Sequence, residues 1–211
     1  KDVSCYGYGD GEATVSISGG ETPYTITWSG GASSTALRDT GLSGGKYYVT
    51  VKDVNDCEAV DSIEIIEPPE FSVSVNNVLL KCHGDKTATF TTTITGGTSP
   101  YSYQWDDALL TTTDTLGNQG AGTYAVVVTD HNHCTATDTG TATEPSAITL
   151  TADTTSSNCN HNDGAIDLTV NGGSPSYTYQ WDDPGNSTSE DLSNIYAGTY
   201  HVTVEDSKHC K

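Results

Sequence analysis

Hydrophobic and polar residues alternate along much of this chain with a period of two. Residues 13–17 (ATVSI) have apolar side chains at every second position, and residues 177–181 (YTYQW) have aromatic side chains at every second position. Such alternation, rich in β-branched and aromatic residues, is typical of a half-buried β-strand. No stretch of comparable length shows the spacing of an amphipathic helix. The pattern therefore predicts an all-β protein.

The same pattern occurs three times. The stretch GGTSPYSYQW at residues 96–105 has near copies at residues 19–28 and 172–181. The tryptophans that end the three copies lie 77 and 76 residues apart, and such a fixed period indicates a tandem array. The Gly-Gly pair supplies turn conformations that other residues adopt poorly. Each copy is thus predicted to contain its own turn and central strand.

Glu-Pro pairs at residues 67–68 and 144–145 also recur at this interval and predict the boundaries between repeats. We expect domains at residues 1–68, 69–145 and 146–211. On this division the middle repeat is complete, the first lacks its opening strand and the third lacks its closing strand. The middle repeat predicts about six strands in two sheets, an immunoglobulin-like β-sandwich. A Gly-x-Tyr sequence before the late strand of each repeat resembles the tyrosine corner of such folds.

Each repeat contains two cysteines, separated by 52, 52 and 51 residues. Six cysteines permit fifteen pairings, but the regular spacing favours one disulfide within each repeat. Bonded cysteines have Cα atoms within about 7 Å, so the chain between them must cross its module an even number of times. A fourth strand around residues 111–116 would complete that number. The predicted pairs are Cys5 with Cys57, Cys82 with Cys134, and Cys159 with Cys210.

Metal binding is the alternative role for these cysteines, because histidines flank those of the second and third repeats. The first repeat has Tyr6 and Asp56 beside its cysteines and no nearby histidine, which favours disulfides. Disulfides persist in oxidising compartments, so we expect an extracellular location.

The balance of 28 acidic and 8 basic residues gives a formal net charge of −20. That charge argues against nucleic acids and anionic membranes as partners. No apolar run is long enough to cross a bilayer, so direct membrane insertion is not expected.

Aspartates near the two cysteines of each repeat are candidate calcium ligands. If the predicted disulfides join the two loops, the carboxylates would supply the oxygen atoms that Ca²⁺ prefers. No D-x-D-x-D-G run is present, and turn aspartates commonly bond their own backbone instead. Calcium is the only cofactor that the sequence suggests. The candidate ligands are Asp10, Asp53, Asp85, Asp130, Asp163 and Asp206.

Candidate catalytic groups do not recur in all three repeats. The acidic pairs at residues 106–107 and 182–183 correspond to Ser29-Gly30 in the first repeat, so turn formation explains them better than catalysis. The histidines have no partner nucleophile outside the disulfide scheme. We therefore predict that the chain is not an enzyme.

The combined motif resembles the SprB repeat family, which forms tandem repeats in very large surface adhesins of gliding Bacteroidota. In order, it contains Cys, Asp-Gly, an alternating strand, Gly-Gly, Pro-Tyr, Trp, Gly-Thr-Tyr, Val-x-Val, Asp, Cys and Glu-Pro. The second copy departs with Asp85-Lys86 in place of Asp-Gly, and the third shifts its proline to Pro175. The resemblance implies a secreted cell-surface adhesin or filament stalk, exported by type IX secretion and tied to gliding motility.

Two functions remain open. A structural and adhesive spacer would have neighbouring repeats, surface glycans or other surface proteins as partners. Carbohydrate- or ligand-binding modules of a surface hydrolase would instead need outward-facing aromatic rings. The outward candidates Tyr48 and Tyr196 do not recur across the repeats, which favours the spacer.

Glycosylation is a further prediction. Asn186-Ser187-Thr188 fits the N-glycosylation pattern, and three Asp-Ser or Asp-Thr sites resemble the O-glycosylation sequence of Bacteroidota. The candidate acceptors are Asn186, Ser62, Thr115 and Thr154.

Overall fold

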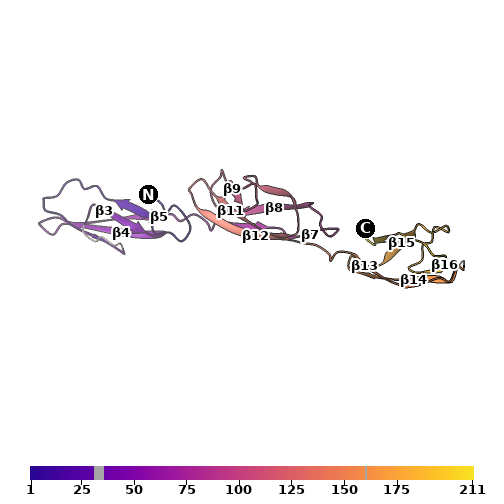
Figure 1. Ribbon diagram of the computed structural model, residues 1–211. Coiled ribbons are helices and arrows are strands. Elements are labelled where there is room, and N and C mark those ends of the chain that lie inside the picture. The colour runs from indigo at the N-terminus through magenta and orange to yellow at the C-terminus, as the bar shows by residue number, and fades with distance from the viewer. Residues whose placement is uncertain (31–35, 160) are drawn as a thin grey trace. The chain divides into compact units, whose positions relative to one another are not determined.

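The computed structural model describes residues 1–30, 36–159 and 161–211, and these consist of strands, turns and loops (Figure 1). Within these ranges there is no helix, and so no helix that could cross a membrane. The all-β prediction is confirmed. Every sheet is built from strands of a single sequence repeat.

The first repeat has five strands in two sheets, β1-β3 and β2-β4-β5, among its described residues. β1 pairs antiparallel with β3, and β4 pairs antiparallel with both β2 and β5. The strands are β1 (Gly11–Thr14), β2 (Thr25–Trp28), β3 (Arg38–Leu42), β4 (Gly45–Lys52) and β5 (Glu58–Ile65).

The second repeat has seven strands, in sheets of order β10-β8-β6 and β7-β12-β11-β9. β6 is its opening strand and pairs antiparallel with β8, whereas the two-residue β7 pairs parallel with β12. The strands are β6 (Ser72–Val75), β7 (Val78–Leu79), β8 (Ala88–Thr95), β9 (Ser102–Trp105), β10 (Thr115–Gln119), β11 (Gly122–Thr129) and β12 (Thr135–Thr143).

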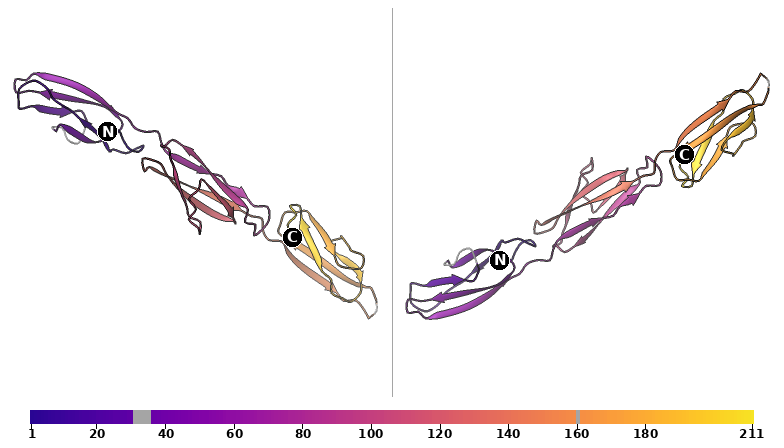
Figure 2. Two further views of the ribbon diagram at one scale, coloured as in Figure 1. Left: turned by 90° about the horizontal axis from the view of Figure 1, so that it is seen from above. Right: turned by 90° about the horizontal axis from the view of Figure 1, so that it is seen from below.

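The third repeat has five strands in its described residues, in sheets β13-β14-β16 and β15-β17. These strands lie side by side in both views of Figure 2, in orange to yellow. The expectation of about six strands per repeat thus becomes five, seven and five. Among the described residues, the first repeat has no counterpart of the opening strand β6, the third has none of the closing strand β12, and the middle repeat gains β7. The strands are β13 (Thr149–Thr155), β14 (Gly164–Asn171), β15 (Tyr177–Trp181), β16 (Leu192–Ile195) and β17 (Val202–Asp206).

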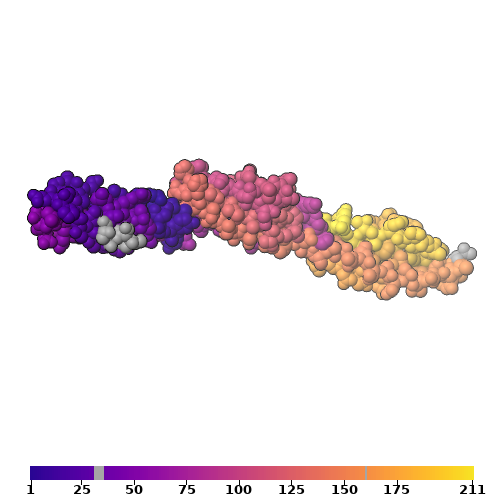
Figure 3. Space-filling view, turned by 60° about the vertical axis from the view of Figure 1, so that its left-hand side comes forward, coloured from indigo at the N-terminus to yellow at the C-terminus, as the bar shows by residue number. Residues whose placement is uncertain are grey.

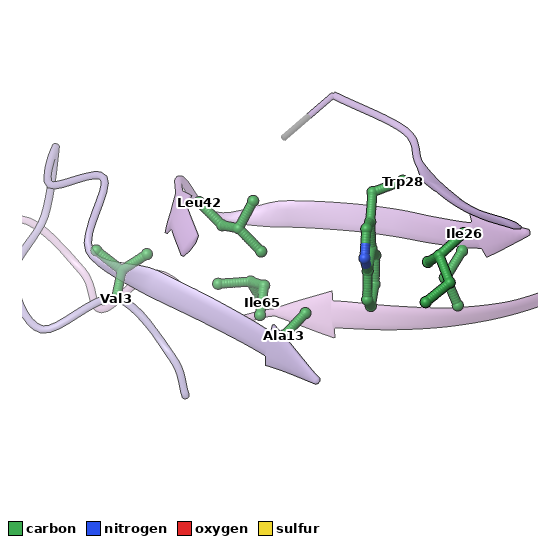
Figure 4. Packing of buried hydrophobic residues seen from close by; sticks show 7 residues of the cluster. Val3, Ala13, Ile26, Trp28, Leu42 and Ile65 are labelled. Carbon is green, nitrogen blue, oxygen red and sulfur yellow. The ribbon is translucent and has the colours of Figure 1, made fainter. Parts of the chain in front are cut away.

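A hydrophobic core fills the first repeat, and its side chains point into the space between the ribbons in Figure 4. Trp28 is 6 % exposed and packs with Ile26 and Val49, while Leu42 and Ile65 are almost fully buried. The third repeat has a corresponding core around Trp181 and Leu168. The alternation in the sequence therefore identifies the buried face of these strands.

Two aromatic anchors recur in each repeat. The tryptophan indole Nε1–H donates to the carbonyl eight residues later, from Trp28 to Ala36 and from Trp181 to Ser189, at 2.9 and 3.0 Å. The tyrosine of the Gly-x-Tyr sequence donates its hydroxyl to the carbonyl four residues earlier, as in Tyr47 to Ser43 at 3.0 Å. Tyr124 and Tyr200 do the same, so the tyrosine-corner prediction is confirmed.

The described chain divides into two compact units, and the division runs through the second repeat. One unit comprises residues 1–75, 92–114 and 125–139, and the other comprises residues 76–91, 115–124 and 140–211. Figure 3 colours the chain by residue number and leaves the undescribed residues grey. Each unit contains one disulfide.

Candidate functional site: the junctions between repeats

Two disulfides join successive repeats instead of closing each repeat on itself. Cys5 bonds Cys134 and Cys82 bonds Cys210, with Cα atoms 5.7 and 5.6 Å apart and sequence separations of 129 and 128. In both bridges the first cysteine of one repeat bonds the last cysteine of the next. The predicted pairing within repeats is therefore wrong. The remaining cysteines, Cys57 and Cys159, are free thiols and are exposed.

The direction of the strands explains the correction. β2 lies against the half of β4 nearest Cys57, with Thr25 opposite Lys52, and β3 then continues toward the start of β4. β2 and β3 together make one crossing, so the chain between Cys5 and Cys57 crosses the first repeat three times rather than four. β4 has eight residues, which span about 26 Å. The two cysteines therefore lie at opposite ends of the first repeat.

Backbone contacts identify these two ends. At the Cys5 end, the Gly7 N–H donates to the Glu67 carboxylate at 2.6 Å and the Val3 N–H donates to the Ile66 carbonyl. At the other end, the Glu21 N–H donates to Asp53, four residues before Cys57, at 3.2 Å. The loop of a first cysteine thus meets the linker that leaves its own repeat.

An aspartate shapes the loop of every last cysteine. In the second repeat, Asp130 is 5 % exposed and accepts the N–H of Cys134 at 2.9 Å and the N–H of Thr98 at 2.8 Å. Asp206 accepts the corresponding N–H groups of Cys210 and Ser174 at 2.9 and 2.8 Å. Hydrogen bonds from the Cys210 and Ser174 backbone lower the pKa of Asp206. The residue before each last cysteine has a positive φ, between 63° and 66°, so the three loops share one backbone conformation there: Asp56, His133 and His209.

A second aspartate shapes the loop of every first cysteine. The Cys82 N–H donates to Asp85 at 2.9 Å, and the Ser4 N–H donates to Asp10 at 2.9 Å. The bond from Ser4 is the main cause that lowers the pKa of Asp10 to about 2, with Lys1 contributing. In the third repeat, hydrogen bonds from the side chain and backbone of Asn158 lower the pKa of Asp163.

The linker of the second junction follows the same plan as the first. Glu144 accepts the Gly84 N–H at 2.7 Å, as Glu67 accepts that of Gly7, and it also pairs with the His83 ring at 3.0 Å. Both glutamates of the Glu-Pro pairs thus accept an N–H from the loop of a bonded cysteine, and the domain boundaries at these pairs stay a prediction. Each junction combines a polypeptide linker, a disulfide and a carboxylate that caps the loop of the first cysteine.

The Gly-Gly pair has a role that the sequence did not reveal. A Cβ on Gly96 would lie 2.1 Å from the Glu70 carbonyl oxygen, and one on Gly172 would lie 1.9 Å from that of Ala147. Both glycines also have positive φ. The linker backbone of each junction therefore passes directly over this turn, and only glycine leaves room for it.

The six aspartates of the calcium prediction mostly accept backbone N–H groups, as in the turn alternative. The pairing of Asp10 with Asp53 needs their loops to meet, and these loops lie at opposite ends of the first repeat. Among residues 1–30, 36–159 and 161–211, no three His, Cys, Asp or Glu residues are grouped as metal ligands. Calcium binding at these aspartates stays a prediction.

The acidic pairs after the tryptophans form turns, as the sequence indicated. Asp107 accepts the Thr111 N–H at 2.7 Å and its hydroxyl at 2.9 Å, and Asp183 makes the same contacts with Ser187. The four glycosylation candidates are all exposed, and their modification stays a prediction: Asn186, Ser62, Thr115 and Thr154.

Comparison with known proteins gives one family. A model of the SprB repeat matches residues 1–33, 73–109 and 151–186, which together make up half of the chain. No curated protein matches.

Several solved structures of low similarity match the chain. The four N-terminal Ig domains of Dscam1 isoform 9.44 are 15 % identical over 57 % of this chain and 37 % of theirs, with a TM-score of 0.30. The eight N-terminal Ig domains of DSCAM isoform 1.30.30 are 13 % identical over 84 % of this chain and 27 % of theirs, with a TM-score of 0.33. A C-terminal fragment of intimin, solved with the intimin-binding domain of the translocated intimin receptor, is 14 % identical over 62 % of this chain and 54 % of its own, with a TM-score of 0.33.

Proposed function

Because the chain belongs to the SprB repeat family, we propose that it is a structural and adhesive segment of a large secreted protein at the cell surface. Its three repeats are immunoglobulin-like sandwiches that act as spacers and not as catalysts. The family places such segments in surface adhesins or filament stalks of Bacteroidota, with type IX export and a role in gliding motility.

The bridging of successive repeats is the observation that carries this proposal. Tension applied between residues 1 and 211 passes through Cys5 to Cys134, back along the chain to Cys82, and across to Cys210. That covalent path contains only about 57 residues, which extend to about 200 Å at most. The same chain without disulfides extends to about 700 Å. Such a short path suits a protein that transmits force, whereas catalysis has no use for it.

Two measurements test the proposal. Antibodies against this segment should label intact, unpermeabilised cells that make the protein, and proteolysis of the cell surface should remove the signal. Labelling that appears only after permeabilisation would contradict a surface role. A glycan array tests the alternative: micromolar binding of the isolated segment to a defined glycan would favour carbohydrate-binding modules.

A further inference from the structure

The end of the first repeat that carries Cys57 has the same aspartate-bonded cysteine loop and Gly-Gly turn as the bonded ends of the second and third repeats, but its cysteine is free. We infer that this end is an acceptor site for a further repeat of the same family, which would supply both an opening strand and the first cysteine of a bridge. This inference rests on the proposed function, because it treats the chain as part of a tandem array.

The loop of Cys57 already has the conformation of the two bonded loops. Asp53 accepts the Cys57 N–H at 3.0 Å and the Glu21 N–H at 3.2 Å, the contacts that Asp130 and Asp206 make at the formed bridges. Cys134 and Cys210, the counterparts of Cys57, are each 8 % exposed and bonded. Cys57 is exposed and free. The two formed bridges therefore show what this loop binds: the first cysteine of the repeat before it.

The Gly-Gly turn beside Cys57 is also vacant. A Cβ on Gly19 would meet no atom within 4 Å, although the equivalent Gly96 and Gly172 lie against the backbone of a linker. The first repeat thus keeps a turn shaped for a close backbone neighbour. Among its described residues nothing fills that position.

A groove lies beside this turn, between residues 15–20, which follow β1, and strands β4 and β5. Its cavity of about 460 Å³ is lined by Val15, Ile17, Tyr24, Val51 and Cys57 among others. Val15 and Ile17 follow the end of β1 and pack on the core. In the second repeat the equivalent residues pair with the opening strand, with Val75 opposite Thr92 and Val73 opposite Ile94. In the third repeat β13 occupies the same place against β14.

The occupant is defined by what fills the other two sites. It is an extended strand with alternating apolar residues, like residues 71–75, and it follows a Glu-Pro linker. The repeat before that linker has its first cysteine 129 residues before Cys57, the separation of Cys5 and Cys134. Cys159 is the complementary half: it is a first cysteine, exposed and free, and its loop is capped by Asp163. Of the two free thiols, Cys57 is thus the last cysteine of its repeat and Cys159 is the first cysteine of its repeat. Each formed bridge also joins one first cysteine to one last cysteine.

The bond forms by thiol–disulfide exchange with a small disulfide such as oxidised glutathione. The Cys57 thiolate attacks that disulfide, which breaks its S–S bond, forms a mixed disulfide and releases one glutathione thiolate. The thiolate of the incoming cysteine then attacks the Cys57 sulfur, forms the bridge and releases the second glutathione thiolate. The two cysteine protons pass to solvent and protonate the released thiolates, so two protein thiols are oxidised and one small disulfide is reduced.

The test is a chain with a copy of residues 1–77 added before Lys1. This places the Cys5 of the copy 129 residues before Cys57, and residues 71–75 of the copy before the vacant edge. After refolding in a glutathione redox buffer, we expect a peptide that links these two cysteines. Alkylation of Cys57 should slow by at least about tenfold relative to the original chain, because a bonded sulfur has no thiolate. Backbone hydrogen exchange at residues 15–18 should slow as well.

Two variants keep the test specific. Replacing Cys5 of the copy by serine should leave Cys57 open to alkylation while residues 15–18 stay protected by the added strand. Gly19→Ala should weaken that protection in the extended chain. Rapid alkylation of Cys57 in the extended chain, its bonding to the Cys57 of the copy, or unprotected residues 15–18 would each overturn the inference. None of these outcomes bears on surface labelling of cells, so the proposed function fails or stands separately.

Discussion

Cys5 and Cys134 lie 129 residues apart in the sequence, and their Cα atoms lie 5.7 Å apart in the structure. Cys82 and Cys210 repeat this relationship one period later. The closed segments overlap, because Cys82 lies inside the first loop and Cys134 lies inside the second. Each bridge therefore joins two successive repeats, and neither belongs to one repeat alone.

Replacement of a cysteine pair should destabilise the chain only if the two cysteines are bonded to each other. The chain-entropy model assigns about 5 kcal/mol to a loop of this length. The pair Cys5→Ser and Cys134→Ser should therefore lower the free energy of unfolding by up to about that amount, measured by chemical denaturation. The pair Cys57→Ser and Cys159→Ser is the matched control and should change it little. Linked Cys5–Cys57 peptides in a non-reducing digest would contradict the pairing.

Mechanical extension should distinguish the same pairings on single molecules. With handles at residues 1 and 211, Cys57→Ser should leave the maximum extension near about 200 Å, because Cys57 carries no bridge. Cys134→Ser should raise it to about 290 Å, because the path then runs unbridged from residue 1 to Cys82. An increase with Cys57→Ser, measured by force spectroscopy, would mean that bridges close within repeats.

Alanine at the first glycine of the Gly-Gly turn should lower the free energy of unfolding more where a linker lies against the turn than where the turn is open. Gly19, Gly96 and Gly172 all have positive φ, so each replacement carries a similar backbone cost of about 1–2 kcal/mol. Gly96→Ala and Gly172→Ala add a collision with a linker carbonyl, whereas Gly19→Ala meets open space. Overpacking of this kind costs about 1–3 kcal/mol more. Backbone hydrogen exchange of the linker should become faster in Gly96→Ala and Gly172→Ala. An equal loss of stability for all three replacements would show that the linker does not lie against the turn.

Asp130 should contribute more to stability than an exposed aspartate of the same repeat. Its two carboxylate oxygens accept the N–H groups of Cys134 and Thr98. In Asp130→Asn one of these acceptors becomes an amide that faces another donor, at a cost of about 1–3 kcal/mol. Asp114→Asn is the control, because Asp114 is exposed and its backbone carbonyl makes the contacts with Thr92. The denaturant midpoints of the two variants measure the difference. If Asp130→Asn lowers the midpoint no more than Asp114→Asn does, this role of Asp130 is contradicted.

The loop of Cys5 should loosen in acid within a defined range. Hydrogen bonding lowers the pKa of Asp10 from 3.8 to about 2 on folding. A lowered folded-state pKa means that the contribution is complete above about pH 4 and is lost as the pH falls toward 2. Hydrogen exchange of the Ser4 N–H should accelerate over that interval, beyond the intrinsic change with pH. Asp10→Asn should remove the dependence, and a transition centred above pH 4 would assign it to another group.

Much of the fold could be predicted because its causes are local. Alternation identified the strands and their buried faces, so Trp28 and Trp181 lie in the cores as expected. The turn role that the sequence offered for the aspartates near the cysteines is likewise local, and Asp130 fulfils it by accepting the N–H of Cys134. The Glu-Pro pairs lie just beyond the last strands of the first and second repeats, since proline removes the donor that a continuing strand needs.

The sequence by itself determined the repeats, the strands and the loops that hold the cysteines, because each depends on residues close together in the chain. Only the tertiary structure decided which cysteines meet. A period-two pattern does not record the direction of a strand, and here β3 continues the crossing that β2 begins. Because of that continuation, Cys57 lies at the opposite end of the repeat from Cys5, and Cys5 bonds Cys134 of the next repeat instead.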